Sequence, residues 1–386
     1  MDDNTVAICA LNRIFGYHPL LAHKLIKQAG NAIAVFSGPA VSIPEHPELA
    51  QQVNPDAMED ARRELERVVS LGCRFLTYDS DDYPARLLEC PDAPLGLYLS
   101  ATSSPAEIFS LRPMIAFVGT RDLSQWGKAW CRNLVMALAA VRTPPAIVSG
   151  LAIGADAVAH AAALECGLPT VGVMATGIES VYPWQNRNLA ARIVNSPGSA
   201  LLTDYPLGTS PVALNFIRRN RIIAGLASAT VVIESKTKGG SLMTARFACE
   251  YSRDVFAVPG RLDDTRSAGC NSLISCHMAE IVLSPEDLAA KLGLAPARRG
   301  PGGSWKSGKG GEEAFRRQLV RILGEDSPAV AVALAICENP GCNSESLSAL
   351  TGLPVHRVLS SVALLEAHGL VTTDPLLRYY ISPAYL

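Results

Sequence analysis

From Pro113 onward, short apolar runs rich in β-branched residues alternate with longer segments that have a helical period. Strands joined by helices in this way form βαβ units, and a series of such units builds a mostly parallel sheet covered by helices. The expected strands span residues 114–118, 146–149, 170–174, 200–203, 230–233, 255–258 and 280–283. Seven strands are enough for a complete doubly wound, Rossmann-like α/β domain.

The first 70 residues have a different pattern, with apolar residues at mixed steps of three and four. These residues are Leu11, Ile14, Leu20, Leu21, Leu25 and Ile26. Breaks at Gly16 and Gly30 favour several short helices over one long helix. Residues 1–70 are therefore expected to form a helical domain, either a SAM-like or helix-hairpin-helix bundle or a small helical cap. A strand near residues 73–78 then opens the α/β domain, which we place at 71–294.

A glycine-rich basic segment follows the α/β domain. Residues 295–311 lack an apolar period, so a flexible linker is expected there. Beyond it, helices are predicted over residues 312–323, 328–337, 344–350 and 355–368, with a short hairpin near 376–381. Helices followed by a hairpin favour a winged-helix domain over residues 312–386.

The composition limits the class of protein. The 386 residues are 48% hydrophobic and carry a formal net charge of −2, so any DNA site must be a local group of cations. No apolar run is long enough to span a membrane and the N-terminus lacks a signal peptide, which predicts a cytoplasmic protein without a membrane partner. The ten cysteines contain no Cys-x-x-Cys pair, so no metal is expected, and Cys131, Cys166 and Cys249 are expected to be buried.

Small and cationic residues follow three of the predicted strands. Gly119-Thr120-Arg121 follows the first, residues 149–156 follow the second, and residues 236–241 follow the fifth. Ligands of open parallel sheets bind at the carboxyl ends of the strands, where backbone N–H groups can hold an anion. A helix near residue 215 adds Arg218, Arg219 and Arg221, which are either a solvated face or part of the same anion site.

Signatures of nucleotide cofactors and of catalysis are absent. No G-x-G-x-x-G follows the first strand of the α/β domain, and the one Walker-like string, residues 303–309, lies in the linker and is followed by Gly310 where Ser or Thr should stand. Neither a dinucleotide nor ATP is expected as a cofactor. His160 on an alanine-rich helix is expected to be packed, and Asp156 to interact with the dipole of its helix, so we expect a non-enzymatic protein.

Taken together, these motifs resemble the DprA (Smf) family of DNA-processing proteins, strongly over residues 70 to 290. The matching strings are Val118-Gly119-Thr120-Arg121, Ser149-Gly150-Leu151-Ala152 through His160, Tyr182-Pro183, Asp204-Tyr205-Pro206, residues 216–226, residues 239–246, Val258-Pro259-Gly260 and Gly269-Cys270-Asn271. Ile153 and Ile217 depart from the family pattern, which usually has a basic residue and a proline there.

The resemblance implies a homodimer that binds single-stranded DNA during natural transformation and recombination. It also implies displacement of single-strand-binding protein and loading of RecA, without turnover of a substrate. The DNA-binding positions that the resemblance implies are Gly119, Arg121, Ser149, Gly150, Arg218, Arg219, Asn220, Arg221, Lys238, Gly240 and Ser241. Phe216 is implied either as a base-stacking residue or as a core residue that anchors its helix.

Two alternatives belong to other functional classes. Nucleoside-monophosphate phosphoribohydrolases have a similar fold and a catalytic glutamate directly after a Gly-Gly-x-Gly-Thr loop, but here Leu242 to Ala245 follow Gly239-Gly240-Ser241. The second alternative is a winged-helix regulator that senses a nucleotide. Its recognition helix would be residues 355–368, where Arg357 is the only lysine or arginine, which is poor for binding duplex phosphates.

Overall fold

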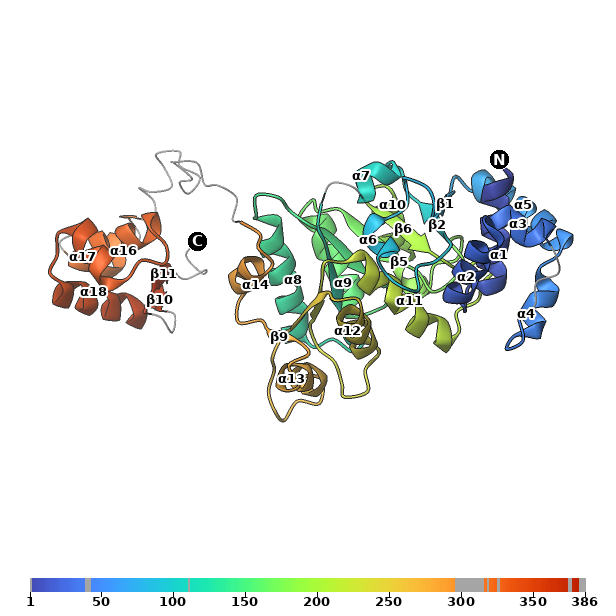
Figure 1. The fold of residues 1–386 in the computed structure, drawn as a ribbon. Coiled ribbons are helices and arrows are strands. Elements are labelled where there is room, and N and C mark those ends of the chain that lie inside the picture. The colour runs from blue at the N-terminus through green and yellow to red at the C-terminus, as the bar shows by residue number, and fades with distance from the viewer. Residues whose placement is uncertain are drawn as a thin grey trace. The chain divides into compact units, whose positions relative to one another are not determined.

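The structure is a computed structural model that describes residues 2–38, 43–109, 112–295, 316–317, 319–324, 327–373 and 377–381. The chain divides into two compact units, Met1–Ala297 and Arg298–Leu386 (Figure 1). Apart from Ala295, the predicted linker over residues 295–311 lies outside the described residues.

A nine-stranded sheet forms the centre of the first unit, in the order β1-β2-β6-β5-β4-β3-β7-β8-β9. The strands are β1 (Arg74–Thr77), β2 (Gly96–Ser100), β3 (Met114–Val118), β4 (Ala146–Ser149), β5 (Thr170–Val173), β6 (Ala200–Thr203), β7 (Ala229–Val232), β8 (Asp254–Ala257) and β9 (Glu280–Ile281). The seven strands from β3 to β9 are mutually parallel, and they confirm the seven predicted ones. β9 is shorter than predicted because the backbone N–H of Leu283 bonds to Asp287 Oδ2 in the next helix.

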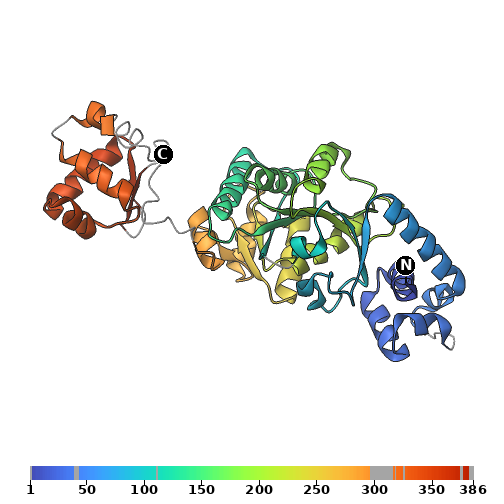
Figure 2. The same cartoon turned by 90° about the horizontal axis from the view of Figure 1, so that it is seen from above.

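Helices cover both faces of the sheet (Figure 2). α8 (Gln125–Ala139), α9 (Ala155–Glu165) and α14 (Pro285–Lys291) pack on one face, against Ile115, Phe117 and Val231. α11 (Ala213–Leu226), α12 (Gly240–Glu250) and α13 (Ala268–Ser275) pack on the other, against Ala116 and Val232. Successive residues of one strand enter opposite cores, which explains why these strands are apolar throughout.

The sheet is extended by an antiparallel pair, of which β1 confirms the strand predicted near residues 73–78. β1 pairs with β2, and β2 pairs in turn with β6. Short elements complete this unit, namely α6 (Ala85–Leu88), α7 (Pro105–Phe109), the 3₁₀ helix η1 (Trp184–Asn186) and α10 (Arg187–Val194).

Five N-terminal helices pack on this extension within the same unit: α1 (Asp3–Phe15), α2 (Pro19–Ala29), α3 (Ala32–Ser37), α4 (Pro47–Gln52) and α5 (Pro55–Ser70). Polar caps begin several of them, as where the carboxylate of Asp2 accepts a 2.9 Å hydrogen bond from the Thr5 N–H. Leu11 and Phe15 of α1 share one core with Leu95, and Phe75 of β1 packs against it. The N-terminal helices and the sheet therefore stabilise each other.

The second unit contains α16 (Pro328–Glu338), α17 (Ser344–Thr351) and α18 (Val355–Ala367), with an antiparallel pair of β10 (Val371–Thr373) and β11 (Tyr379–Ile381). The predicted helices at 344–350 and 355–368 are confirmed within one residue. Among the described residues no single helix is long and apolar enough to cross a membrane, and only α17 and α18 taken together, bent by 107°, pass that test by length and composition.

The described cysteines follow the sequence expectation only in part. Cys131 is buried between α8 and α9, and burial raises the pKa of its thiol to about 12. Cys166 is half-buried and Cys249 is exposed, so the expected burial of Cys249 is wrong. Cys249 lies on the solvent side of α12, next to the buried Ala248, where the helical period turns it outward.

Candidate nucleic-acid interface

A cleft of ≈ 900 Å³ opens at the carboxyl ends of β3 and β7. The chain leaves β3 in one direction towards β4 and later returns to place β7 on the other side of β3, so the strand order reverses here. Ligands of doubly wound sheets bind at such a reversal. The lining includes Gly119, Arg121, Asp156, Tyr182, Phe216, Arg219, Asn220, Lys236, Lys238, Gly240 and Ser241.

The loop after β3 forms a rigid wall of the cleft. The Thr120 N–H donates to Glu234 O (2.7 Å), and the Ala155 N–H donates to Thr120 O (3.2 Å). Gly154 has a φ of +82°, and a Cβ there would lie 2.7 Å from Arg121 Cα. Only glycine fits this close approach, which holds the loop after β3 against the beginning of α9.

Three cations in the cleft are exposed: Arg121 after β3, and Lys236 and Lys238 after β7. Within the described residues, none of them forms an ion pair with a carboxylate. The Arg121 guanidinium lies over the ring of Phe216, 5.2 Å from its centre, and Phe216 in turn contacts Tyr182 at 5.5 Å between ring centres. The cleft, whose lining also includes Asp122 and Asp156, therefore combines three cations outside ion pairs with aromatic surface.

The N-terminus of α12 points into the same cleft. Its N-cap, Gly239, provides no side-chain cap, and nothing lies within 4 Å of the position where a Cβ of Gly240 would be. Ser241 uses its hydroxyl internally, donating to Ser235 Oγ at 2.8 Å. An uncapped helix N-terminus carries partial positive charge and free N–H groups, which favours an anion beside Gly240.

The arginines of α11 divide into two groups, with Arg219 beneath the cleft and Arg218 and Arg221 on another side of the helix. Arg219 is 4% exposed, and its guanidinium donates to Gly150 O (2.5 Å) and to Val173 O beneath the cleft. Burial lowers the pKa of Arg219 to about 10, although it remains charged at neutral pH. A Cβ on Gly150 would lie too close to Nη2 of Arg219, so a larger residue at position 150 would clash with this guanidinium. Arg219 thus closes the ends of β4 and β5 from below.

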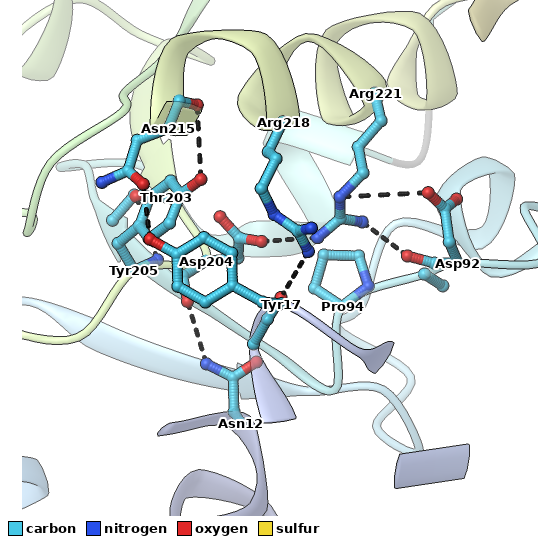
Figure 3. A network of polar contacts seen from close by, with 12 residues as sticks. Asn12, Tyr17, Asp92, Pro94, Thr203, Asp204, Tyr205, Asn215, Arg218 and Arg221 are labelled. Carbon is cyan, nitrogen blue, oxygen red and sulfur yellow. Dashed lines mark hydrogen bonds and ion pairs between the residues drawn. The ribbon is translucent and has the colours of Figure 1, made fainter. Parts of the chain in front are cut away.

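Arg218 and Arg221 point away from the cleft, Arg218 towards Gly16 and Tyr17 and Arg221 towards Asp92 and Asp204 (Figure 3). Arg218 donates to Gly16 O at 3.1 Å and lies 4.5 Å from the ring centre of Tyr17. Arg221 is buried and donates to Asp204 Oδ2 at 2.6 Å and to Asp92 O at 2.5 Å. These two arginines join α11 to the rest of the unit and do not line the cleft.

The loop after β4 is also occupied by internal contacts. Ser149 is fully buried and donates from Oγ to Phe117 O at 2.6 Å. Asp156 accepts from the N–H groups of Gly150 (3.1 Å) and Ala152 (3.3 Å). Burial raises the pKa of Asp156, opposed by the charge of Arg219. Ser149 and Gly150 therefore shape the floor beneath the cleft and are not part of its lining.

The cleft thus brings together part of the predicted set. Gly119, Arg121, Phe216, Arg219, Asn220, Lys238, Gly240 and Ser241 line it, whereas Ser149, Gly150, Arg218 and Arg221 do not.

The predicted set of DNA-binding positions omitted Lys236 and Tyr182, although both lie in motifs that the sequence analysis named, and it also omitted Glu234. Glu234 lies two residues after the end of β7 and accepts from the Ser124 N–H (2.9 Å) and the Ser124 hydroxyl (2.5 Å) at the start of α8. The position of Glu234 near a strand end could have indicated a role at this edge of the sheet. Its pairing with Ser124 could not be predicted, because the two residues lie 110 positions apart in the sequence.

No group of three or more His, Cys, Asp or Glu side chains that could hold a metal ion occurs in the part of the chain that the structure describes. His160 of α9 is fully buried, and its Nδ1 lies 2.7 Å from Thr170 Oγ1. Burial, assisted by the charge of Arg219, lowers the pKa of His160 from 6.5 to about 3. His160 is therefore neutral in the folded protein.

A loss of stability in acid follows from His160. Below pH 6.5 the unfolded chain takes up a proton that the folded protein refuses until about pH 3. The contribution of His160 to stability is therefore complete above pH 6.5 and is lost as the pH falls towards 3, by up to ~1.4 kcal/mol per pH unit. We expect His160→Asn to flatten the pH dependence of the free energy of unfolding in this window, as measured by urea denaturation.

The exposed His277 supplies the control, because it has a φ of +57° that asparagine tolerates. His277→Asn should retain the wild-type slope. An unchanged slope in His160→Asn would contradict the neutral state assigned to this ring.

Comparisons with known proteins agree on one family. The family model described as DNA recombination-mediator protein A matches residues 74–293. Protein Smf of Synechocystis is 33% identical over 96% of this chain and 89% of its own length. DNA processing protein DprA of Streptococcus pneumoniae is 38% identical over 55% of this chain and 71% of its own.

Solved structures point the same way. The X-ray structure of DprA from Streptococcus pneumoniae aligns with a TM-score of 0.59 at 29% identity, over 75% of this chain and 98% of that chain. DNA processing protein A from Helicobacter pylori aligns with a TM-score of 0.50 at 25% identity, over 56% and 95%. Because the family model covers more than half of the chain and full-length relatives match, this chain belongs to the DprA (Smf) family of DNA recombination-mediator proteins.

Proposed function

We propose that this protein binds single-stranded DNA in the cleft at the ends of β3 and β7. The observation that carries the proposal is the convergence of Arg121, Lys236 and Lys238 on the uncapped N-terminus of α12, with no carboxylate paired to these cations in the described ranges. Such a set fits phosphate groups that follow one another along a backbone. The aromatic rings of Phe216 and Tyr182 provide a surface on which a base can stack.

The choice of single strands over duplex has its own support. A duplex presents its bases only at groove edges, whereas the cleft places two aromatic rings next to its cations. The structure from Helicobacter pylori was described for its single-stranded DNA binding mode, and it is a relative of this chain. We include Gly119 and Asn220 in the interface because both line the cleft.

Membership of the family supports a proposal for the biological role. We propose that the protein acts on DNA strands in the cytoplasm during natural transformation and recombination. It would do so as a homodimer that displaces single-strand-binding protein and delivers RecA, with a winged helix in the second unit. Support comes from the names of the family and its relatives, which refer to DNA processing and to mediation of recombination.

We propose a binding role without catalysis. The two buried carboxylates near the cleft are both engaged internally, Glu234 by Ser124 and Asp156 by the N–H groups of Gly150 and Ala152. Neither is positioned as a free general acid or base. Incubation with AMP should therefore release no adenine, and steady release of the base would favour the phosphoribohydrolase alternative.

Binding should be electrostatic and nearly independent of base sequence. We expect the affinity for a fluorescent oligothymidylate, measured by anisotropy, to fall linearly with salt in a log-log plot, because phosphate contacts release counterions. Mixed-sequence single strands should bind with similar affinity, and a duplex of equal length at least about tenfold more weakly. Tighter binding of the duplex would instead support the winged-helix regulator.

A further inference from the structure

Two large aromatic side chains continue outward from the cleft. Tyr182 lines the cleft and is 46% exposed, whereas Trp184 is 67% exposed and lies outside the lining. A single exposed aromatic residue is common on protein surfaces. Here the exposed indole follows a cleft aromatic by two residues, so the aromatic surface extends beyond the cleft.

The position of Trp184 is fixed relative to the cleft. Trp184 begins η1, whose last residue, Asn186, is buried and donates from Nδ2 to Leu151 O at 2.8 Å. Leu151 belongs to the loop after β4, which also contains Ala152 of the cleft lining. A buried hydrogen bond therefore ties η1 to the cleft floor.

A cation accompanies this indole. The guanidinium of Arg187 lies 4.3 Å from the ring centre of Trp184, and Arg187 is exposed. Throughout the described ranges no carboxylate lies within ion-pair distance of Arg187, so its charge is free to attract an anion. The pair repeats the arrangement inside the cleft, where Arg121 lies over Phe216.

We propose that Trp184 and Arg187 form a second contact site for the single strand that the cleft binds. A base stacks on the indole while Arg187 pairs with a neighbouring phosphate, so that the strand leaves the cleft past Tyr182 towards α10. This inference rests on the proposed function and adds the path of the strand. The exposed neighbours Gln185 and Asn188 are polar, which suits a nucleic acid better than an apolar protein partner.

Strand length distinguishes the two contact sites. An oligothymidylate of about five nucleotides can occupy the cleft alone, whereas one of about twenty can also reach Trp184. We expect Trp184→Ala in the full-length protein to weaken binding of the long strand by roughly tenfold and that of the short strand by less than about twofold. Trp184→Phe should restore most of the lost affinity, because phenylalanine still offers a stacking face.

Matched variants serve as controls. Trp126 is 44% exposed and lies outside the cleft lining, with its ring 5.9 Å from that of Trp130. Arg192 is an exposed arginine on the same helix as Arg187. We expect Trp126→Ala and Arg192→Ala to bind the long strand as the wild type does, whereas Arg187→Ala should weaken that binding and reduce its salt dependence.

Tryptophan fluorescence distinguishes direct contact of the strand with Trp184 from a purely structural role of Trp184, because only direct contact quenches the emission of this indole. The long strand should quench the emission of the wild type, and most of this quenching should be lost in Trp184→Phe. If the wild type binds the long strand but Trp184→Ala binds it equally well, the second site is wrong and the proposed function stands. An equal loss in Trp126→Ala would also overturn the second site. If the wild type binds neither strand, the proposed function itself fails.

Discussion

Replacing Arg221 with alanine is expected to lower the free energy of unfolding by about 3–5 kcal/mol. Its guanidinium is buried and donates to Asp204 Oδ2 at 2.6 Å and to Asp92 O at 2.5 Å. Burial already raises the pKa of Asp204, and the charge of Arg221 is the largest influence that opposes this rise. Without Arg221, the folded protein must hold a buried carboxylate that lacks its counter-charge.

The control is an exposed ion pair of the same type. Arg261 bonds to both carboxylate oxygens of Asp263 (2.9 and 2.8 Å) but is 82% exposed, so Arg261→Ala should leave the urea midpoint nearly unchanged. Urea unfolding followed by circular dichroism measures both variants. If Arg221→Ala were as stable as the wild type, Arg221 would be free for a ligand, contrary to its assigned role.

Replacing Arg121 and Lys238 is expected to have the largest effect on DNA binding. Both are exposed in the cleft and have no carboxylate partner in the described residues. Each alanine variant should weaken binding of oligothymidylate roughly tenfold, because a charge-assisted contact is lost. The double variant should lose roughly a hundredfold, and the log-log salt slope should fall by about one unit per lost contact.

The melting temperature of the variants distinguishes a DNA-binding role of Arg121 and Lys238 from a structural role. Arg121 contacts only the ring of Phe216 among the charged or aromatic groups described, so the melting temperature should stay near that of the wild type. Arg246, an exposed arginine of α12 outside the cleft lining, is the matched control. Full affinity in a folded double variant, or an equal loss in Arg246→Ala, would place the DNA elsewhere.

The parallel sheet could be predicted because its strands are short, apolar throughout and separated by helical segments. The position of the cleft followed as well, since any doubly wound sheet exposes its strand ends at the reversal of strand order. β1 was predicted as a strand, but its pairing with β2 was harder to predict. Their pairing extends the sheet from β6 towards the N-terminal helices, and the 18 residues between them are too many for a tight hairpin that the sequence would signal.

The arginines of α11 show where a local pattern fails. Arg218, Arg219 and Arg221 lie within one helical turn, where residues three apart share a side and neighbouring residues do not, so Arg218 and Arg221 point away from Arg219. Which side faces the cleft depends on how α11 packs, and this is set by contacts such as Asp204 with Arg221. The sequence showed three cations, but only the packing distinguishes a ligand from a structural residue.

Crosslinking is the most direct test of the central claim, that a single strand lies in the cleft. An oligothymidylate that contains a photoreactive 5-iodouracil can be irradiated in complex with the full-length protein, and the attached peptides can be mapped by mass spectrometry. If the strand lies in the cleft, we expect the oligonucleotide to crosslink to Phe216, whose ring lies against Arg121, or to Tyr182, whose ring contacts Phe216. Crosslinks confined to residues 344–381 of the second unit, with none at these two rings, would contradict the claim.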